Sequence, residues 1–213
     1  MALAAQLSEE QLAFLEGRIS ASDGVTKLES AKNEKHTIWS NLDAKLAAVT
    51  KYKDALDLQA RPHVRKLIES KSVEIQKDSE RIVSAAVGEL LDGKELIFRG
   101  AELLEGAERE LVLLRVALME IESLERKTNK IFLEVKRDWE TSKGDFADAK
   151  ADLLSFHLLM SLAPAMRQNG ALTFDFNNVG EVGGLRQAAR FARREAAAAS
   201  RTLDEILRGE QNS

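Results

Sequence analysis

Apolar residues recur at alternating spacings of four and three through much of the chain, which is the pattern of an amphipathic helix. The longest such run contains seventeen positions, of which fourteen are apolar. We call these positions the seam: Leu104, Ala107, Leu111, Leu114, Leu118, Ile121, Glu125, Thr128, Phe132, Val135, Trp139, Ser142, Phe146, Ala149, Leu153, Phe156 and Met160. The seam covers about eight heptads, so it predicts one long helix that packs against partner helices as in a coiled coil.

The residues before the seam predict three further helical segments. Ser8 and Gln11 form a capping-box pattern, which predicts a helix of about three turns after Ser8. A turn signal at 22–24 precedes a second apolar run, which predicts a long helix over 25–60. Pro62 interrupts this run, and we interpret it as a restart, with Pro62 in the first turn of a new helix, rather than as a kink.

The residues after the seam predict a stop, a loop and a last helix. Pro164 and Asn169-Gly170 are expected to end the long helix. Residues 170–184 contain four glycines, and 173–176 alternate apolar and polar residues, so this segment predicts a loop or a small hairpin. An alanine-rich amphipathic helix is expected over 185–208.

Together these elements predict an all-α protein, an elongated antiparallel bundle or coiled coil of long helices, with a Gly-rich loop or small hairpin near 170–184 and a C-terminal helix. We expect three parts, 1–168, 169–184 and 185–213, within one domain. Aspartates and lysines beside the seam favour parallel self-pairing. The seam itself alternates large and small residues, such as Trp139 and Ser142, and this favours antiparallel packing. Core volume outweighs exposed ion pairs, which are each worth about 0–1 kcal/mol.

Composition narrows the classes of protein. The 213 residues include 31 Lys+Arg, 35 Asp+Glu, 2 Pro and no Cys, and the net charge is -4. Without cysteine there is no disulfide framework and no thiol nucleophile. Charge is evenly spread, so a nucleic-acid partner is not expected. No apolar stretch approaches the ~18 residues of a membrane span, and we expect a cytoplasmic protein without a transmembrane segment.

Candidate chemistry is sparse. Gly88–Lys94 matches the glycine and lysine spacing of a phosphate-binding loop, but Glu95 stands where that loop needs Ser or Thr. The three histidines, His36, His63 and His157, form no ligand pair. Two polar seam residues, Glu125 and Thr128, are the remaining candidates for a buried site. The sequence therefore predicts no enzyme, no cofactor and no metal.

Two sets of residues are candidates for interaction rather than catalysis. Arginines on the last helix are expected to meet a carboxylate-rich partner, phosphate or anionic lipid: Arg186, Arg190, Arg193, Arg194 and Arg201. The large apolar seam residues are expected to mediate self-association: Leu111, Leu114, Leu118, Ile121, Phe132, Trp139 and Phe146.

The function that this pattern favours is a non-enzymatic helical scaffold or assembly protein, which acts through self-association or protein–protein interaction. A homo-oligomer, a protein partner or both are expected. The alternative is a helical oligomer that binds or remodels a membrane surface. In a pore-forming variant of it, the apolar stretch 153–165 and the loop after it would insert into the bilayer.

Overall fold

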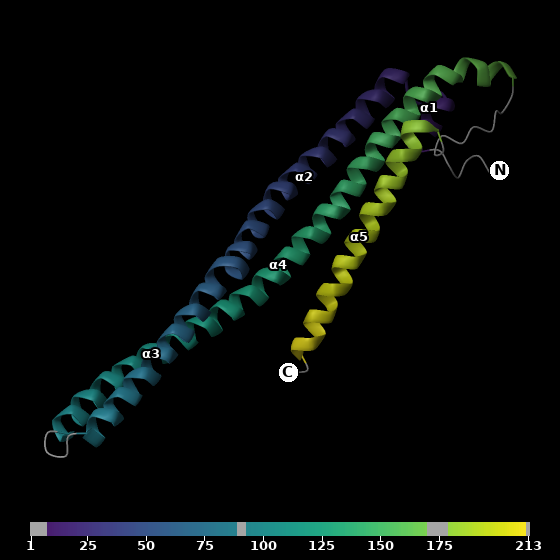
Figure 1. Ribbon diagram of the computed structural model, residues 1–213. Coiled ribbons are helices and arrows are strands. Elements are labelled where there is room, and N and C mark those ends of the chain that lie inside the picture. The colour runs from purple at the N-terminus through teal and green to yellow at the C-terminus, as the bar shows by residue number, and fades with distance from the viewer. Residues whose placement is uncertain (1–7, 89–92, 170–178, 212–213) are drawn as a thin grey trace. The chain divides into compact units, whose positions relative to one another are not determined.

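The computed structural model describes residues 8–88, 93–169 and 179–211, almost all of which are helical (Figure 1). The helices are α1 (Glu9–Leu15), α2 (Ala21–Ala55), α3 (Arg61–Gly88), α4 (Gly93–Asn169) and α5 (Gly180–Gln211). A π-helical turn, Leu56–Ala60, joins α2 to α3. No strand occurs in the described ranges, and the predicted all-α bundle is confirmed. The hairpin expected at 173–176 lies outside the described residues.

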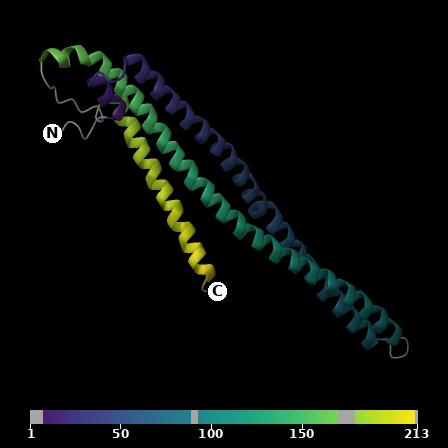
Figure 2. The same cartoon turned by 180° about the vertical axis from the view of Figure 1, so that it is seen from behind.

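The chain divides into two compact units, and α2 and α4 contribute residues to both. Unit 1 contains Met1–Ala48 and Phe132–Ser213, and unit 2 contains Val49–Ile131. In unit 1, α1, the first part of α2 and α5 surround the second part of α4 (Figures 1 and 2). In unit 2, α3 lies along the first part of α4.

The core of unit 1 is centred on Phe156 of α4, whose side chain is fully buried. Leu28 and Leu153 are the other buried members of this cluster, and the ring of Phe14 in α1 lies 5.4 Å from that of Phe156. Gly24 of α2 lies directly against the Phe156 ring: a Cβ atom there would stand 2.2 Å from the ring carbon Cζ. This glycine therefore makes room for the largest core side chain.

The helices pack antiparallel within each unit, as the alternation of large and small seam residues predicted. In unit 1, the start of α2 meets Phe156, and farther along α2 Trp39 stacks on Phe146, with ring centroids 5.6 Å apart. In unit 2, Arg61 pairs with Glu125 at 3.0 Å, and Lys71 with Glu110 at 2.8 Å. Contacts that advance along one helix as they recede along the other define antiparallel neighbours.

The two N-terminal helices begin as capped helices, but not all of their bounds were predicted correctly. Ser8 and Gln11 form the expected capping box, although α1 has 7 residues rather than about three turns. The N-cap of α2 is Ser20, whose Oγ accepts a hydrogen bond from the Asp23 backbone N–H at 3.1 Å. Residues 22–24, which were expected to form a turn, therefore lie in the first turn of α2. Gly24 allows close packing against Phe156 and does not bend the chain.

Pro62 lies in the first turn of α3, as predicted, but the helical path from α2 continues into α3 without a break. The residues on both sides of the π-helical turn, Ala55 and Arg61, have right-handed helical φ and ψ. The Arg61 N–H donates to the carbonyl of Leu56, five residues earlier. Proline lacks an N–H and its ring clashes with the carbonyl four residues before it. The wider turn before Pro62 accommodates both defects.

Two predicted boundaries near the C-terminus are also wrong. Pro164 lies inside α4 and does not end it; the helix ends at Asn169, at the second of the two predicted stops. The last helix begins at Gly180 rather than at residue 185. Within its first turn Val182 is 2% exposed, so burial outweighs the low helix propensity of the neighbouring glycines.

Candidate functional site

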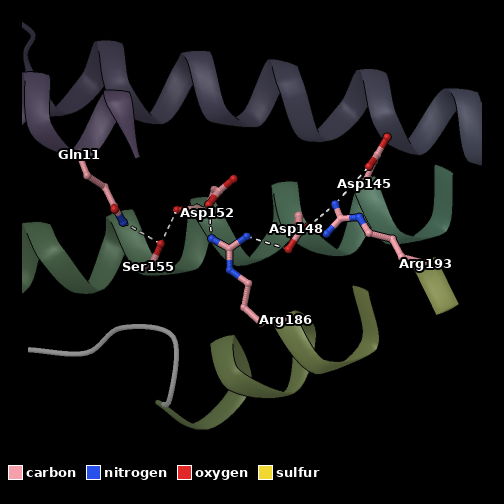
Figure 3. A network of polar contacts seen from close by, with 7 residues as sticks. All are labelled: Gln11, Asp145, Asp148, Asp152, Ser155, Arg186 and Arg193. Carbon is pink, nitrogen blue, oxygen red and sulfur yellow. Dashed lines mark hydrogen bonds and ion pairs between the residues drawn. The ribbon is translucent and has the colours of Figure 1, made fainter. Parts of the chain in front are cut away.

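A network of arginines and aspartates joins α5 to α4 within unit 1 (Figure 3). Arg186 donates to Asp148 at 2.7 Å and also to Asp152, so its guanidinium bridges two carboxylates one turn apart. Arg193 donates to Asp148 at 2.5 Å and to Asp145 at 3.3 Å. Asp148 thereby accepts from both arginines and lies at the centre of the network.

The charges in this network are balanced by their partners. Burial lowers the pKa of Arg186, but the hydrogen bonds and charges of Asp148 and Asp152 outweigh it and raise the pKa above its ordinary value. For Arg193, burial again lowers the pKa, and Asp148 and Asp145 more than compensate. Both arginines therefore stay charged, and the network acts as a fixed electrostatic link between two helices.

The predicted carboxylate-rich partner of the arginine stripe is thus partly α4 of the same chain. A lysine beside the seam also pairs with a residue of the same chain: Lys150 pairs with Glu181 of α5 at 3.2 Å. The aspartates that favoured parallel self-pairing, Asp145 and Asp152, instead receive arginines of α5. The spacing of these aspartates in the sequence predicted that a partner helix exists, but it did not predict which helix that is.

Gly144 lies at the contact between α4 and α5. It is buried, and a Cβ atom there would stand 3.2 Å from the backbone oxygen of Ala189. Gly144 is not a seam residue, and α5 covers the part of α4 on which it lies. The α5 face toward α4 is formed by small buried residues: Ala189, Ala192, Ala196 and Ala199. Small side chains on both helices allow the close approach that the arginine–aspartate network needs.

The other three arginines of the stripe point elsewhere. Arg190, Arg194 and Arg201 are exposed, and within the described ranges no carboxylate forms an ion pair with them. Phe191, beside Arg190, is 58% exposed. The structure therefore separates the five predicted arginines into two that hold α5 in place and three that face solvent.

An aromatic cluster in unit 1 contains two of the predicted self-association residues, Trp139 and Phe146. Phe146 contacts Trp39 and His36 of α2, and the Trp139 Nε1–H donates to Asp43 at 3.0 Å. These side chains pack against α2 of the same unit. They build the helical bundle, and the chain already supplies their partner.

Glu125, one of the two polar seam residues, joins α4 to α3 through an ion pair. Glu125 receives a hydrogen bond from Arg61 at 3.0 Å, while its Oε1 atom is buried without a hydrogen bond. Thr128 is buried one turn farther along α4. One polar layer in an apolar seam favours one register of packing, and this is the role that its contacts support.

The first part of α4 carries an apolar surface that sequence reasoning missed. Val112, Leu113, Val116 and Met119 are 55%, 67%, 46% and 67% exposed. We call these four residues the outer face. Val116 is two residues from both Leu114 and Leu118 of the seam, and two residues turn a helix by about 200°. The outer face is therefore on the other side of α4 from the seam.

The remaining predicted self-association residues are all half-buried: Leu111, Leu114, Leu118, Ile121 and Phe132. Leu114 lines a groove together with Leu67 of α3. The signal for the outer face was present in the sequence, since Val112, Val116 and Met119 have helical spacing. It was overlooked because one amphipathic stripe had already been assigned to this helix.

Within the described residues, no group of three His, Asp or Glu side chains could hold a metal ion. In the same part of the chain no helix has an apolar stretch long enough to cross a bilayer. Glu89–Asp92 of the phosphate-loop match lie outside the described residues. Comparison with protein families, curated proteins and solved structures found no match to this chain.

Proposed function

We propose that this protein is a non-enzymatic helical assembly protein, which acts as a scaffold through self-association or protein–protein interaction. The observation that carries the proposal is the outer face of α4. Four large apolar side chains within eight residues of one helix are about half exposed or more. Contiguous apolar surface of this kind marks interaction sites in folded proteins.

The distribution of exposed apolar residues supports the same function. Of thirteen exposed large apolar residues among those described, ten belong to unit 2. Two helices alone leave much of their apolar surface in water, whereas a bundle of three or four helices covers it. Unit 2 is therefore the part of the chain that gains most from a further partner.

The experiment is mass photometry and sedimentation velocity of the purified chain over a range of concentrations. We expect oligomers that grow with concentration. The double variant Leu113→Gln with Met119→Gln should shift the protein toward the monomer. Leu58→Gln is the matched control, because Leu58 is 73% exposed but lies outside the outer face. A wild-type chain that remains monomeric would remove self-association as its function.

The second candidate is binding to an anionic membrane surface, and the solvent-facing side of α5 is the observation that favours it. Arg190, Arg194 and Arg201 recur at spacings of four and seven, and Phe191 adds an exposed ring beside them. Basic residues with an exposed apolar side chain are typical of surface-bound helices. The pore-forming variant is less well supported, because Leu153, Phe156, Leu159 and Ala163 belong to the core of unit 1.

Co-sedimentation with phosphatidylserine vesicles and with neutral vesicles tests this candidate. Binding should need the anionic lipid and should fall in the double variant Arg190→Glu with Arg194→Glu. Arg81→Glu, at an exposed position of α3, is the control for Arg190→Glu alone, because both single substitutions change the net charge by two units. Equal binding to both kinds of vesicle, or none to either, would exclude the candidate.

A further inference from the structure

The arginines of α5 divide into two sets that lie on different sides of the helix. Arg186 and Arg193 are paired with aspartates of α4. Arg190, Arg194 and Arg201 are exposed, and no ion pair involves them in the part of the chain that the structure describes. We call these three residues the basic side of α5. Their spacings of four and seven residues keep them within about 40° of one another around the helix.

The basic side faces away from the rest of unit 1. Ala192 is fully buried and lies two residues from both Arg190 and Arg194, and two residues turn a helix by about 200°. Leu203 is 6% exposed and lies two residues after Arg201. The apolar side of α5 is therefore engaged within unit 1, while the arginines of the basic side are open to a partner.

Acidic residues of α5 border only the C-terminal end of the basic side. Asp204 and Glu205 are exposed, and they lie about 60° and 40° from Arg201 around the helix, on either side of it. The same two carboxylates border Arg208, which is also exposed. Glu195 is half-buried and lies about 100° or more from every arginine of the basic side. The positive potential is therefore concentrated at the first two arginines.

We propose that α5 binds anionic phospholipid headgroups through its basic side while it remains attached to α4. The proposal rests on the second candidate function and specifies how the membrane is bound. Charge complementarity selects the partner, because guanidinium groups form paired hydrogen bonds with phosphate oxygens. The three arginines span about 16 Å along the helix, so they match a surface of many headgroups better than one small anion.

The attachment to α4 fixes the direction in which the basic side points. Arg186 and Arg193 each bridge two aspartates (Figure 3). Ala189 and Ala192 lie against Gly144 of α4, and rotation of α5 would bring an arginine into this close contact. The basic side is therefore held in one orientation before binding, which reduces the entropy that binding costs.

This mode of binding is electrostatic, because the apolar side of α5 stays within unit 1. Phe191, which is 58% exposed beside Arg190, adds one ring that can enter the headgroup layer. Charges in solution are screened beyond about 10 Å at 0.1 M salt and beyond about 3 Å at 1 M salt. Vesicle binding should therefore be lost at about 1 M salt.

Substitution of single arginines tests the basic side. Co-sedimentation with phosphatidylserine vesicles over a range of lipid concentrations gives the partition coefficient. Arg190→Gln and Arg194→Gln should each lower it about fivefold, which corresponds to about 1 kcal/mol for an arginine near an anionic surface. Arg208→Gln is the matched control, since it removes the same charge from α5 but between Asp204 and Glu205. It should change the partition coefficient far less, and equal effects of the three substitutions would overturn the assignment.

A disulfide between the two helices tests whether α5 stays attached. A Cβ atom at Gly144 would stand 3.6 Å from the Cβ of Ala192, and disulfides join Cβ atoms about 3.5–4.5 Å apart. The native sequence has no cysteine, so Gly144→Cys with Ala192→Cys introduces a single link. The oxidised variant should bind vesicles as tightly as its reduced form. Hydrogen exchange of the wild-type α5 amides on vesicles is the second measurement, and their protection should be retained.

The outcomes separate this inference from the second candidate function. A wild-type chain that binds neither phosphatidylserine nor phosphatidylcholine vesicles defeats both, and retention of poly-glutamate instead would assign the basic side to an acidic protein. Equal binding to both lipids also defeats both, because phosphatidylcholine has the phosphate but no net charge. Binding that survives about 1 M salt, or that stops when the disulfide forms, shows insertion or release of α5. Either result overturns this inference and leaves membrane binding standing.

Discussion

The two parts of α4 follow one heptad pattern but have different surroundings. In unit 1 the helix is covered by α1, α2 and α5, and fourteen of the fifteen buried apolar residues among those described belong to this unit. Among the apolar residues of unit 2 whose burial the structure describes, only Leu56 is buried to that degree. An apolar seam therefore predicts that partners exist, but the number of partner helices decides how much of the surface is covered.

The first test of this difference between the units removes the centre of the unit 1 core. Phe156→Ala should lower the free energy of unfolding by about 3–5 kcal/mol, because it deletes a fully buried ring and leaves a cavity. Thermal and denaturant unfolding measure the change. Leu113→Ala, at an exposed position of unit 2, should change stability far less. Equal effects would show that both units depend on packing to the same extent.

The second test fills the space beside the same ring. Gly24→Ala should destabilise the protein by about 1–3 kcal/mol, because its Cβ would collide with the Phe156 ring. Gly106→Ala is the control, since nothing lies within 4 Å of a Cβ there. That substitution should stabilise α4 by up to about 1 kcal/mol through helix propensity alone. Opposite signs in chemical denaturation would confirm the contrast, and a stable Gly24→Ala variant would contradict it.

The third test concerns the attachment of α5, the helix that unit 2 lacks. Arg186→Met should cost about 1–2 kcal/mol, because it leaves the half-buried Asp152 without its cation. Arg190→Met, on the exposed side of α5, should cost almost nothing. Hydrogen exchange of the α5 amides is the measurement, and unchanged protection in Arg186→Met would show that the alanine contacts alone hold the helix.

The smallest effect concerns α1. Burial raises the pKa of Glu10, but a backbone hydrogen bond and Lys27, 3.1 Å away, outweigh it and lower the pKa below 4.5. A carboxyl with a lowered pKa stabilises the folded state above about pH 4.5, and this contribution disappears as the pH falls through the lowered value. Lys27→Met should therefore cost less than about 1 kcal/mol at pH 7 and nothing at acid pH. A cost that is independent of pH would contradict this ion pair.

Sequence alone was sufficient for the fold class, the antiparallel direction and the capping box at Ser8, because each depends on local spacing or residue volume. It failed at Pro164, which lies inside α4, and it did not predict the continuous helical path before Pro62. The cost of one proline depends on whether neighbouring turns can widen or continue. It also failed at Gly24, which resembles a turn position in sequence but is a site of close packing against Phe156. That contact joins residues far apart in the chain.

The candidate surfaces show the same limit. The arginine stripe was visible in the sequence, but which arginines pair with α4 depends on the rotation of α5 about its axis. The outer face was missed because an exposed apolar residue and a buried one look alike in a sequence. Exposure is a property of the packed helices, and it was the structure that distinguished Val116 from Leu114.

The arrangement of partners along the chain also bears on the order of folding. The α3–α4 ion pairs of unit 2 join residues 57 and 64 positions apart, whereas the α2–α4 and α1–α4 hydrogen bonds of unit 1 join residues 96 and 144 positions apart. Closing a short loop costs less entropy than closing a long one, and local contacts form faster. We expect the α3–α4 hairpin to form first during synthesis, with its outer face already in place while the second part of α4 still awaits α5.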